Sequence, residues 1–395
     1  MTPGARTQAA IELLDAIVAA ARDQGPAADT LIARYFAGRR YAGSKDRRAV
    51  RELVYAAIRR AGERPVSGRA AMIGLAEGDP ALTATFDGGV HAPLPIEPGE
   101  AAAPAGAAPG WLVNRLQESG LDAGEMAALV GRAPLDVRVN TLRTSFNEVR
   151  SALPDALPLP HAPGGLRLPA GTNVEQLAAW RDGAIEVQDE GSQIVSSAAK
   201  VGASMNVVDL CAGAGGKSLA LAAAMNDRAE ILACDIDRSR LSRLAPRAAR
   251  AGVSIIETRL LDPGREAAAL ADWQDRADVV LVDAPCSGTG TWRRNPEARW
   301  RLTPERLDRL AATQRILVNI AATLVRPGGA MVYVVCSLLD AEGAGQVDAF
   351  LTRHRGWCAE PLALPAGRPH SAGLRLTPAH DGTDGFFVAR LVRPC

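Results

Sequence analysis

Two cysteines each follow a short apolar run of the chain. Cys286 stands in VVLVDAPCSGTGTW and Cys336 in GGAMVYVVCSLL. In an open parallel sheet, ligands bind in the crevice at the carboxyl ends of the strands, so two thiols that both follow strands are expected to meet at one site. A thiolate is an effective nucleophile, and a pair of thiols beside a ligand pocket therefore predicts covalent chemistry.

A glycine-rich turn, DLCAGAGGKS, precedes both thiols and continues a β-type run at residues 206–210. Its glycines let the backbone bend tightly and approach a ligand before a helix begins. Asp235 ends the next run about 20 residues further on, the position at which an acid holds ribose hydroxyls in dinucleotide-binding folds. With Asp262 and Asp283 at later strand ends, the pattern predicts a nucleoside-containing cofactor.

A phosphate loop is the alternative interpretation of this turn. GGKS, followed later by an apolar run and Asp283, resembles the two motifs of enzymes that bind nucleoside triphosphates. The loop pattern G-x-x-x-x-G-K-[ST] requires glycine where this chain has Cys211. That mismatch makes a phosphate-loop nucleotidase the weaker hypothesis.

The combination of two thiols with an acid suits one reaction on a pyrimidine ring. Carbon 5 of cytosine is a poor nucleophile, but addition of a thiolate to carbon 6 turns the ring into an enamine that attacks an electrophilic methyl group. The proton on carbon 5 must then leave and the thiolate must be expelled, a step in which a second thiol can serve. Asp283 would hold the ring nitrogen and stabilise the developing charge. The structural alternative is that Cys286 and Cys336 are small buried apolar residues.

Composition limits the class of protein. Of the 395 residues 47% are hydrophobic, yet no apolar run reaches the length of a membrane span, and the N-terminal segment lacks the layout of a signal peptide. The six cysteines form no C-x-x-C pair and the five histidines are scattered, so neither disulfides nor a metal site is expected. We expect a soluble, cytoplasmic monomer of several domains with reduced thiols, no membrane contact and no metal.

Four stretches of different pattern divide the chain. Residues 1–62 carry apolar side chains at helical spacing and predict an all-helical domain, and residues 63–109 have the Gly, Pro and Ala content of a linker. Residues 110–182 predict a small α/β module. Over residues 183–395 strands and helices alternate, which predicts an α/β fold with a doubly wound, Rossmann-like sheet.

Basic residues are concentrated near the N-terminus, although the net charge of the whole chain is only +1. In this region two acids, Asp46 and Glu52, accompany nine basic residues, an excess that suits RNA phosphates. A solvated helix face is the alternative interpretation. The nine are Arg34, Arg39, Arg40, Lys45, Arg47, Arg48, Arg51, Arg59 and Arg60.

Several motifs resemble, in their order along the chain, those of a known family. They are DLCAGAGGKS, CDID, LLD, DAPCSGTGTWRRNP, YVVCSLL and DGTDGFF. They are similar to the RsmB-like (Sun/Fmu, Nop/Nsun) family of S-adenosylmethionine-dependent RNA cytosine-carbon-5 methyltransferases. The resemblance covers roughly residues 111–392, since RVNTLR and VQDEGSQIV also resemble segments that precede the catalytic domain. SKDRRAVRELVYAAIRR is similar to the NusB-like RNA-binding domain of bacterial members, and residues 110–182 would be RRM-like.

The resemblance implies a class I methyltransferase that methylates a cytosine in RNA, with ribosomal RNA as the expected substrate and transfer RNA as the alternative. Cys336 would be the nucleophile, Cys286 would assist product release and Asp283 would complete the catalytic set. A non-catalytic RNA-binding assembly factor is a further alternative, which the presence of both thiols disfavours. The implied contacts to S-adenosylmethionine are Cys211, Ala212, Gly213, Ala214, Gly215, Gly216, Lys217, Asp235, Asp262 and Asp283.

Two positions depart from the family pattern. Members usually have proline where this chain has Ala214, and Thr or Ser where it has Val335. Ala214 is expected to loosen the turn and Val335 to alter the packing beside the nucleophile, but neither removes a reacting group. The segment TWRRNPEARWR places Arg293, Arg294, Arg299 and Arg301 around Trp292 and Trp300. It is expected either to stack on and pair with an extruded nucleotide or to pack within the fold.

Overall fold

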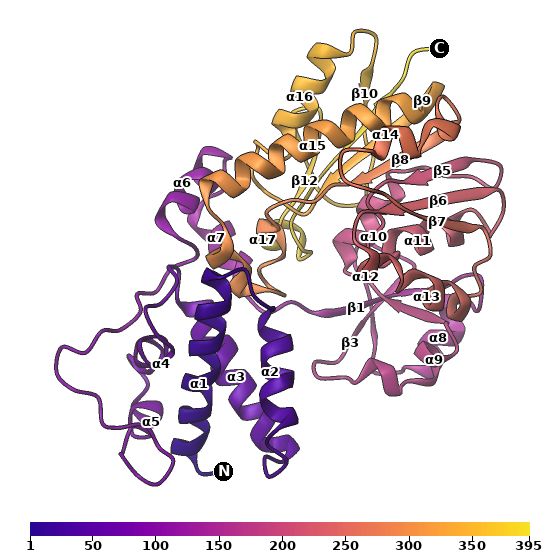
Figure 1. Ribbon diagram of the computed structural model, residues 1–395. Helices are drawn as coiled ribbons and strands as arrows, with labels where there is room; N and C mark the ends of the chain where they lie inside the picture. Colours follow the sequence, from indigo (N-terminus) through magenta and orange to yellow (C-terminus); the bar gives the residue numbers. More distant parts are fainter. The chain divides into compact units, whose positions relative to one another are not determined.

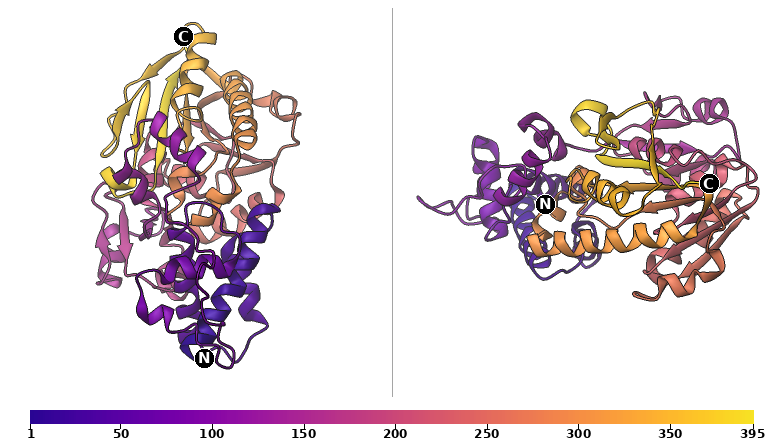
Figure 2. Two further views of the ribbon diagram at one scale, coloured as in Figure 1. Left: turned by 90° about the vertical axis from the view of Figure 1, so that its left-hand side faces the viewer. Right: turned by 90° about the horizontal axis from the view of Figure 1, so that it is seen from above.

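The computed structural model describes residues 1–395, which divide into two compact units. The first, which we call the helical unit, comprises Met1–Arg132 and Thr291–Pro304. The second, the sheet unit, comprises Ala133–Gly290 and Glu305–Cys395. Figures 1 and 2 show the helices of the first unit in indigo and purple, and the strands of the second in magenta to yellow.

The helical unit contains seven α-helices and a 3-10 segment. They are α1 (Pro3–Arg22), α2 (Ala28–Ala37), α3 (Ser44–Arg60), α4 (Gly68–Ala76), α5 (Pro80–Thr83), α6 (Gly110–Glu118), α7 (Ala123–Leu129) and η4 (Pro296–Arg301). Leu14 and Ile17 on α1 and Val54 and Ile58 on α3 recur at helical spacing and are buried in one core. α1, α2 and α3 accordingly lie side by side (Figure 1). This agrees with the helical pattern expected for residues 1–62.

Residues 63–109, expected to form a linker, are folded into the helical unit instead. They contain α4 and α5, and Met72 of α4 is fully buried in the core. Small residues occur here because backbones pass close together: a Cβ added at Gly68 would lie 2.2 Å from the carbonyl oxygen of Ile11. The linker prediction was wrong because a composition rich in glycine and alanine also permits close approach of helices.

The segment rich in arginine and tryptophan packs inside the helical unit. Trp300 is 4% exposed, and its indole N–H donates to the carbonyl oxygen of Ala61 at 3.2 Å. Arg299 is fully buried and donates to the carbonyl oxygens of Ile58 at 2.6 Å and Ala61 at 2.8 Å, which end α3. Trp292 is also fully buried. The prediction that this segment packs within the fold is therefore confirmed. The alternative, that a nucleotide stacks on its tryptophans, was wrong.

The sheet unit begins with a small antiparallel sheet that pairs in the order β2-β3-β1-β4. Its elements are β1 (Leu135–Val139), α8 (Phe146–Ala152), β2 (Leu157–Pro158), β3 (Gly165–Leu168), η1 (Val174–Gln176), α9 (Ala178–Arg181) and β4 (Ile185–Val187). Val137 and Leu166 pack against Val149 of α8. The module was expected to span residues 110–182, but both boundaries differ in the structure. It begins later, because α6 and α7 belong to the helical unit, and it ends later, because β4 pairs with β1.

A nine-stranded sheet forms the rest of the sheet unit. Its strands are β5 (Asn206–Asp209), β6 (Glu230–Asp235), β7 (Ile256–Leu260), β8 (Ala277–Asp283), β9 (Val325–Val335), β10 (Cys358–Glu360), β11 (Arg368–His370), β12 (Gly373–Leu376) and β13 (Phe386–Val392). They pair in the order β11-β12-β13-β9-β8-β5-β6-β7, with β10 on β13. The strands from β5 to β9 are parallel, and β13 is antiparallel to β9.

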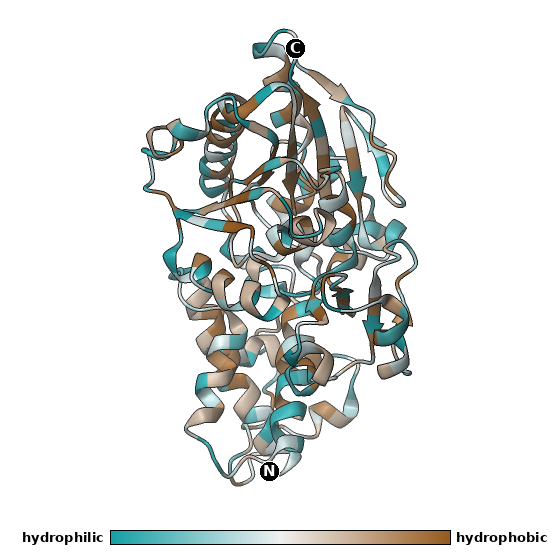
Figure 3. Ribbon diagram, turned by 90° about the vertical axis from the view of Figure 1, so that its right-hand side faces the viewer, coloured by the Kyte–Doolittle hydropathy of each residue, from teal (hydrophilic) through white to brown (hydrophobic).

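Both faces of the large sheet are buried. Alternate residues enter two separate cores, Val208 and Val280 on one face and Val207 and Val279 on the other. The covering helices are α10 (Glu190–Ser197), α11 (Gly216–Ala224), α12 (Arg238–Leu241), α13 (Leu244–Ala251), α14 (Glu266–Ala269), η2 (Ala271–Trp273), η3 (Thr289–Thr291), α15 (Pro304–Leu324), α16 (Ala344–Arg353) and α17 (Pro378–Asp381). The central strands are largely brown, the apolar colour, in Figure 3, whereas the edge strands carry teal, polar stretches. The predicted doubly wound α/β fold is confirmed.

None of the helices combines the length and the hydropathy that crossing a membrane requires.

Candidate functional site

The glycine turn lies between the end of β5 and the start of α11. Gly213 has φ +56° and Gly215 φ +83°, both in the left-handed region that glycine adopts without strain. Gly215 also lies against α13, where an added Cβ would come within 2.5 Å of Leu244 Cγ. Gly216 is the first residue of α11. Two of the three glycines that the sequence singled out therefore shape the turn itself.

Asp235 ends β6, the strand beside β5, and its carboxylate lies against the turn. Its Oδ2 accepts from the backbone N–H of Gly213 at 2.7 Å, and its Oδ1 accepts from that of Asp237 at 2.7 Å. Each oxygen can accept a second hydrogen bond, so ribose hydroxyls can still be held here. Ile236 is 55% exposed directly after this acid and offers an apolar surface to a base. Sequence reasoning missed Ile236, although CDID shows an apolar residue after the strand-ending acid.

Lys217, in the first turn of α11, connects the glycine turn with the thiols. Its Nζ donates to Asp283 Oδ2 at 2.7 Å, and 12% of its side chain is exposed. Burial lowers the pKa of Lys217, but the charge of Asp283, the hydrogen bond to it and the nearby Cys336 outweigh burial and raise the pKa above its ordinary value. Lys217 is therefore a fixed positive charge that can stabilise negative charge developing on a bound ring.

The parallel pairing of β8 and β9 brings the two cysteines together. Asp283 at the end of β8 lies opposite Val334 of β9, so the residues that follow both strands leave the sheet at the same edge. The Sγ atoms of Cys286 and Cys336 are 3.4 Å apart. The hydrogen bond to Cys336, burial, and the charges of Cys336 and Glu342 raise the pKa of Cys286 well above its ordinary value. The two thiols converge as predicted, and Cys286 keeps its proton in the resting site.

A buried carboxylate joins the two thiol segments. Glu342 is 1% exposed and accepts from the backbone N–H of Ser287 at 2.8 Å, from the Ser287 hydroxyl, and from the Ser337 hydroxyl at 2.6 Å. Gln314 Nε2 of α15 donates to it at 3.0 Å. Ser287 and Ser337 are the residues directly after the two cysteines, so one group fixes both segments. The sequence analysis did not identify Glu342. The available signal was the serine that directly follows each cysteine, because both serines donate to this carboxylate.

The remaining predicted residues lie at or just after the ends of strands β5, β7 and β9. Burial, with the charge of Asp209, raises the pKa of Cys211 well above its ordinary value, so Cys211 is an uncharged thiol. The N–H of Ala212 donates to a carbonyl oxygen of β6 at 2.8 Å. Asp262 is exposed beyond the end of β7, and Val335 is buried in the core of the sheet. No group of three or more His, Cys, Asp and Glu side chains is placed to hold a metal ion.

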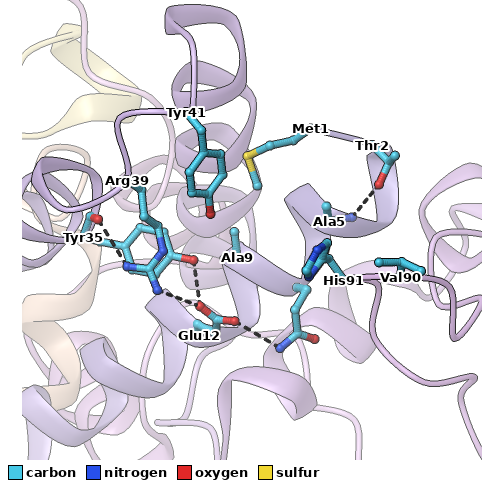
Figure 4. Close-up of a pocket in the computed structure, with 11 residues that line it drawn as sticks. Met1, Thr2, Ala5, Ala9, Glu12, Tyr35, Arg39, Tyr41, Val90 and His91 are labelled. Carbon is cyan, nitrogen blue, oxygen red and sulfur yellow. Dashed lines mark hydrogen bonds and ion pairs between the residues drawn. The ribbon is translucent and has the colours of Figure 1, made fainter.

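A separate pocket of about 620 Å³ lies in the helical unit (Figure 4). On its wall the Glu12 carboxylate accepts from the Tyr35 hydroxyl at 2.8 Å and from Arg39 at 3.4 Å. The Arg39 guanidinium stacks on the Tyr35 ring, 3.6 Å from its centre. Glu12 and Arg39 form an ion pair on this wall, and no cysteine lines the pocket.

Four of the nine basic residues between Arg34 and Arg60 form ion pairs within the helical unit. Ion pairs join Arg39 to Glu12, Arg48 to Glu52, Arg51 to Asp29 and Arg60 to Glu77. Arg34, Arg40 and Lys45 are exposed and take part in none of the ion pairs, and Tyr41 between them is 74% exposed. Arg48 and Arg51 are paired but remain 73% and 54% exposed, so phosphates can still reach them together with Arg34, Arg40 and Lys45.

The glycine turn, the strand-ending acid and the paired thiols at one edge of a Rossmann-like sheet fit a methyltransferase of the class I fold. A family model described as 16S rRNA methyltransferase RsmB/F matches residues 200–392. Ribosomal RNA small subunit methyltransferase B of Xylella fastidiosa is 36% identical over 299 residues, which cover 72% of this chain and 68% of the relative. A probable enzyme of the same name from Synechocystis sp. is 34% identical, with 72% and 66% covered. The chain belongs to the RsmB/F methyltransferase family and spans about two thirds of the length of these relatives.

Solved structures share the fold. The crystal structure of PH0851 has a TM-score of 0.76 at 23% identity and covers 99% of each chain. NSun6 from Pyrococcus horikoshii, solved with SFG, has a TM-score of 0.61 at 20% identity and covers 72% of this chain and 94% of that one. Both support the Rossmann-like architecture of the sheet unit.

Proposed function

We propose that the protein transfers a methyl group from S-adenosylmethionine to carbon 5 of a cytosine in ribosomal RNA, through a covalent adduct with Cys336. The observation that carries this proposal is the pair of thiols 3.4 Å apart, close to the ion pair of Lys217 and Asp283. The names of the relatives, ribosomal RNA small subunit methyltransferase B, support the class of substrate. Transfer RNA is the alternative substrate.

The glycine turn suits S-adenosylmethionine, which supplies the electrophilic methyl group when bound. Gly213 and Gly215 present no side chain, Asp235 retains acceptor capacity for the ribose, and Ile236 offers an apolar surface to the adenine. Asp262 would add a contact from the end of β7.

The two thiols take different roles in the proposed reaction, following the roles that the family resemblance implies. The hydrogen bond to Cys336, burial and the charges of Cys336 and Glu342 raise the pKa of Cys286, so we assign Cys286 to the later step. Cys336, after losing its proton to solvent, is the nucleophile that attacks carbon 6. Once the Cys336 sulfur is bound to carbon 6 as a neutral thioether, two of the causes that raise the pKa of Cys286 are gone. Cys286 then gives up its own proton to solvent more readily and becomes available as a base.

Product release follows from this change. The Cys286 thiolate takes the proton from carbon 5, the electron pair of that C–H bond restores the ring double bond, and the bond between Cys336 and carbon 6 breaks to release the Cys336 thiolate. During addition the positive charge of Lys217 stabilises the negative charge that develops on the ring. Once the ring nitrogen has taken up a proton from solvent, Asp283 accepts a hydrogen bond from it, and this proton returns to solvent on elimination.

A methyl-transfer assay tests the function. Purified protein is incubated with labelled S-adenosylmethionine and, separately, with ribosomal and transfer RNA from a strain that lacks the gene, and bisulfite sequencing locates the product. We expect one cytosine of small-subunit ribosomal RNA to become resistant to bisulfite. Methylation of transfer RNA alone would show that transfer RNA is the substrate. RNA binding without incorporation into either RNA would contradict catalysis and favour a non-catalytic assembly factor.

A further inference from the structure

Ala214 lies between two left-handed glycines, and its carbonyl oxygen is held by a side chain from outside the turn. Arg247 Nη1 of α13 donates to this oxygen at 2.6 Å. Leu244, three residues earlier on the same helix, packs under Gly215. α13 therefore supports the glycine turn at two adjacent residues.

Arg247 is itself held by the small sheet. Its Nη2 donates to Oε2 of Glu186 on β4 at 3.0 Å, and Arg250 pairs with the other carboxylate oxygen. The Glu186 side chain is 4% exposed. Arg250 also stacks on Trp180, with its Cζ 4.0 Å from the ring centre. Because one buried carboxylate accepts from both partly exposed guanidinium groups, Glu186 fixes the position of both arginines.

The C-terminal end of α13 is also attached to the small sheet. Asn140 Nδ2, next to β1, donates to the carbonyl oxygen of Ala251 at 2.8 Å. Gly183 passes so close to α13 that an added Cβ would lie 2.0 Å from the carbonyl oxygen of Arg250. α13 and the small sheet therefore hold each other at several points, and Arg247 reaches the turn from a fixed base.

The negative charge of Glu186 offsets the repulsion among three nearby arginines. Burial lowers the pKa of Arg138 on β1 to about 10, with the charge of Glu186 raising it and the charge of Arg247 lowering it further. Arg138, Arg247 and Arg250 thus lie close to one carboxylate. Without the charge of Glu186 the three cations repel one another, and Arg247 loses the contact that aims it at Ala214.

We propose that Glu186 is a positioning residue for the cofactor turn and acts on it through Arg247. The small sheet then sets the affinity for the cofactor, besides any contact that it makes with RNA. The inference rests on the proposed binding of S-adenosylmethionine at this turn, and it explains how a turn with Ala214 keeps a defined shape.

Cofactor binding to full-length variants tests the inference. Calorimetry with S-adenosylmethionine should show a rise in Kd of about tenfold for Glu186→Gln and for Arg247→Ala, because each loses a hydrogen bond to a charged group. Arg247→Lys should recover part of the affinity, and the double variant should be no weaker than the worse single variant, since both act on one contact. The matched control is Arg243→Ala, an exposed arginine that precedes α13.

The steady-state constants separate positioning from a general loss of structure. The KM for S-adenosylmethionine should rise in both variants, while kcat at saturating cofactor and the Kd for RNA stay at the wild-type values. Wild-type cofactor affinity in Arg247→Ala, whose side chain is 23% exposed and tolerates replacement, would overturn the inference. An equal decline of cofactor affinity, RNA affinity and kcat would also overturn it, by showing a structural role. Wild-type protein that binds no S-adenosylmethionine would instead contradict the proposed function.

Discussion

Replacing Glu342 by glutamine removes the charge that joins the two thiol segments while keeping the shape of the side chain. Four donors reach this carboxylate: the N–H and hydroxyl of Ser287, the hydroxyl of Ser337 and the amide of Gln314. A hydrogen bond to a charged group contributes about 1.5–3 kcal/mol and a neutral one about 0.5–1.5 kcal/mol, so the loss over these four contacts is about 4–6 kcal/mol. A neutral amide is less costly to bury, which reduces the expected loss to about 2 kcal/mol.

The effect on turnover should exceed the effect on folding. The serines follow the cysteines directly, and a misplacement of about 1 Å at reacting groups costs about a hundredfold in rate. We therefore expect Glu342→Gln to fold, to bind S-adenosylmethionine as the wild type does, and to lose about a hundredfold in single-turnover methyl transfer. Urea unfolding gives the free energy of unfolding, and Asp348→Asn, an exposed acid of α16, is the control. Wild-type rates in Glu342→Gln would refute the reasoning.

Further predictions concern the cofactor, RNA and pH. Asp235→Ala should weaken binding of S-adenosylmethionine in calorimetry, and saturable ATP binding without S-adenosylmethionine binding would favour a phosphate loop instead. Replacing Arg34, Arg40 and Lys45 by glutamine should lower RNA affinity and flatten its salt dependence in filter-binding titrations, whereas unchanged affinity would show a solvated face. Burial raises the pKa of Asp209 from 3.8 to about 7. Between these two values the folded protein holds a proton that the unfolded chain has released. The free energy of unfolding therefore falls as pH rises toward 7. Asp209→Asn should therefore gain in free energy of unfolding relative to wild type between pH 5 and pH 8 in urea titrations; no change in this difference would contradict the shift.

The arrangement of the thiol site was predictable because its signals are local. Apolar runs identified β8 and β9, and the rule that parallel strands share a carboxyl edge placed Cys286 beside Cys336. Gly213 and Gly215 were predictable because the turn requires backbone conformations that other residues avoid.

Long-range packing was not predictable in the same way. Arg299 and Ile58 are separated by 241 positions, and nothing near either residue indicates that one donates to the carbonyl oxygen of the other. Glu342 lies in a loop without a motif, so its role emerges only from the position of Ser287 and Ser337. The prediction of a linker at residues 63–109 was wrong because composition does not distinguish a flexible segment from one packed closely against helices.

The covalent mechanism is tested most directly by replacing each thiol separately and searching for protein trapped on RNA. Cys336→Ala has no nucleophile, so it should form no adduct and be inactive. Cys286→Ala should attack and transfer the methyl group but fail to eliminate, so a denaturation-resistant protein–RNA band should accumulate that requires S-adenosylmethionine and disappears when Cys336 is also replaced. Adduct in Cys336→Ala and none in Cys286→Ala would reverse the roles, and full activity in both variants would contradict the covalent mechanism itself.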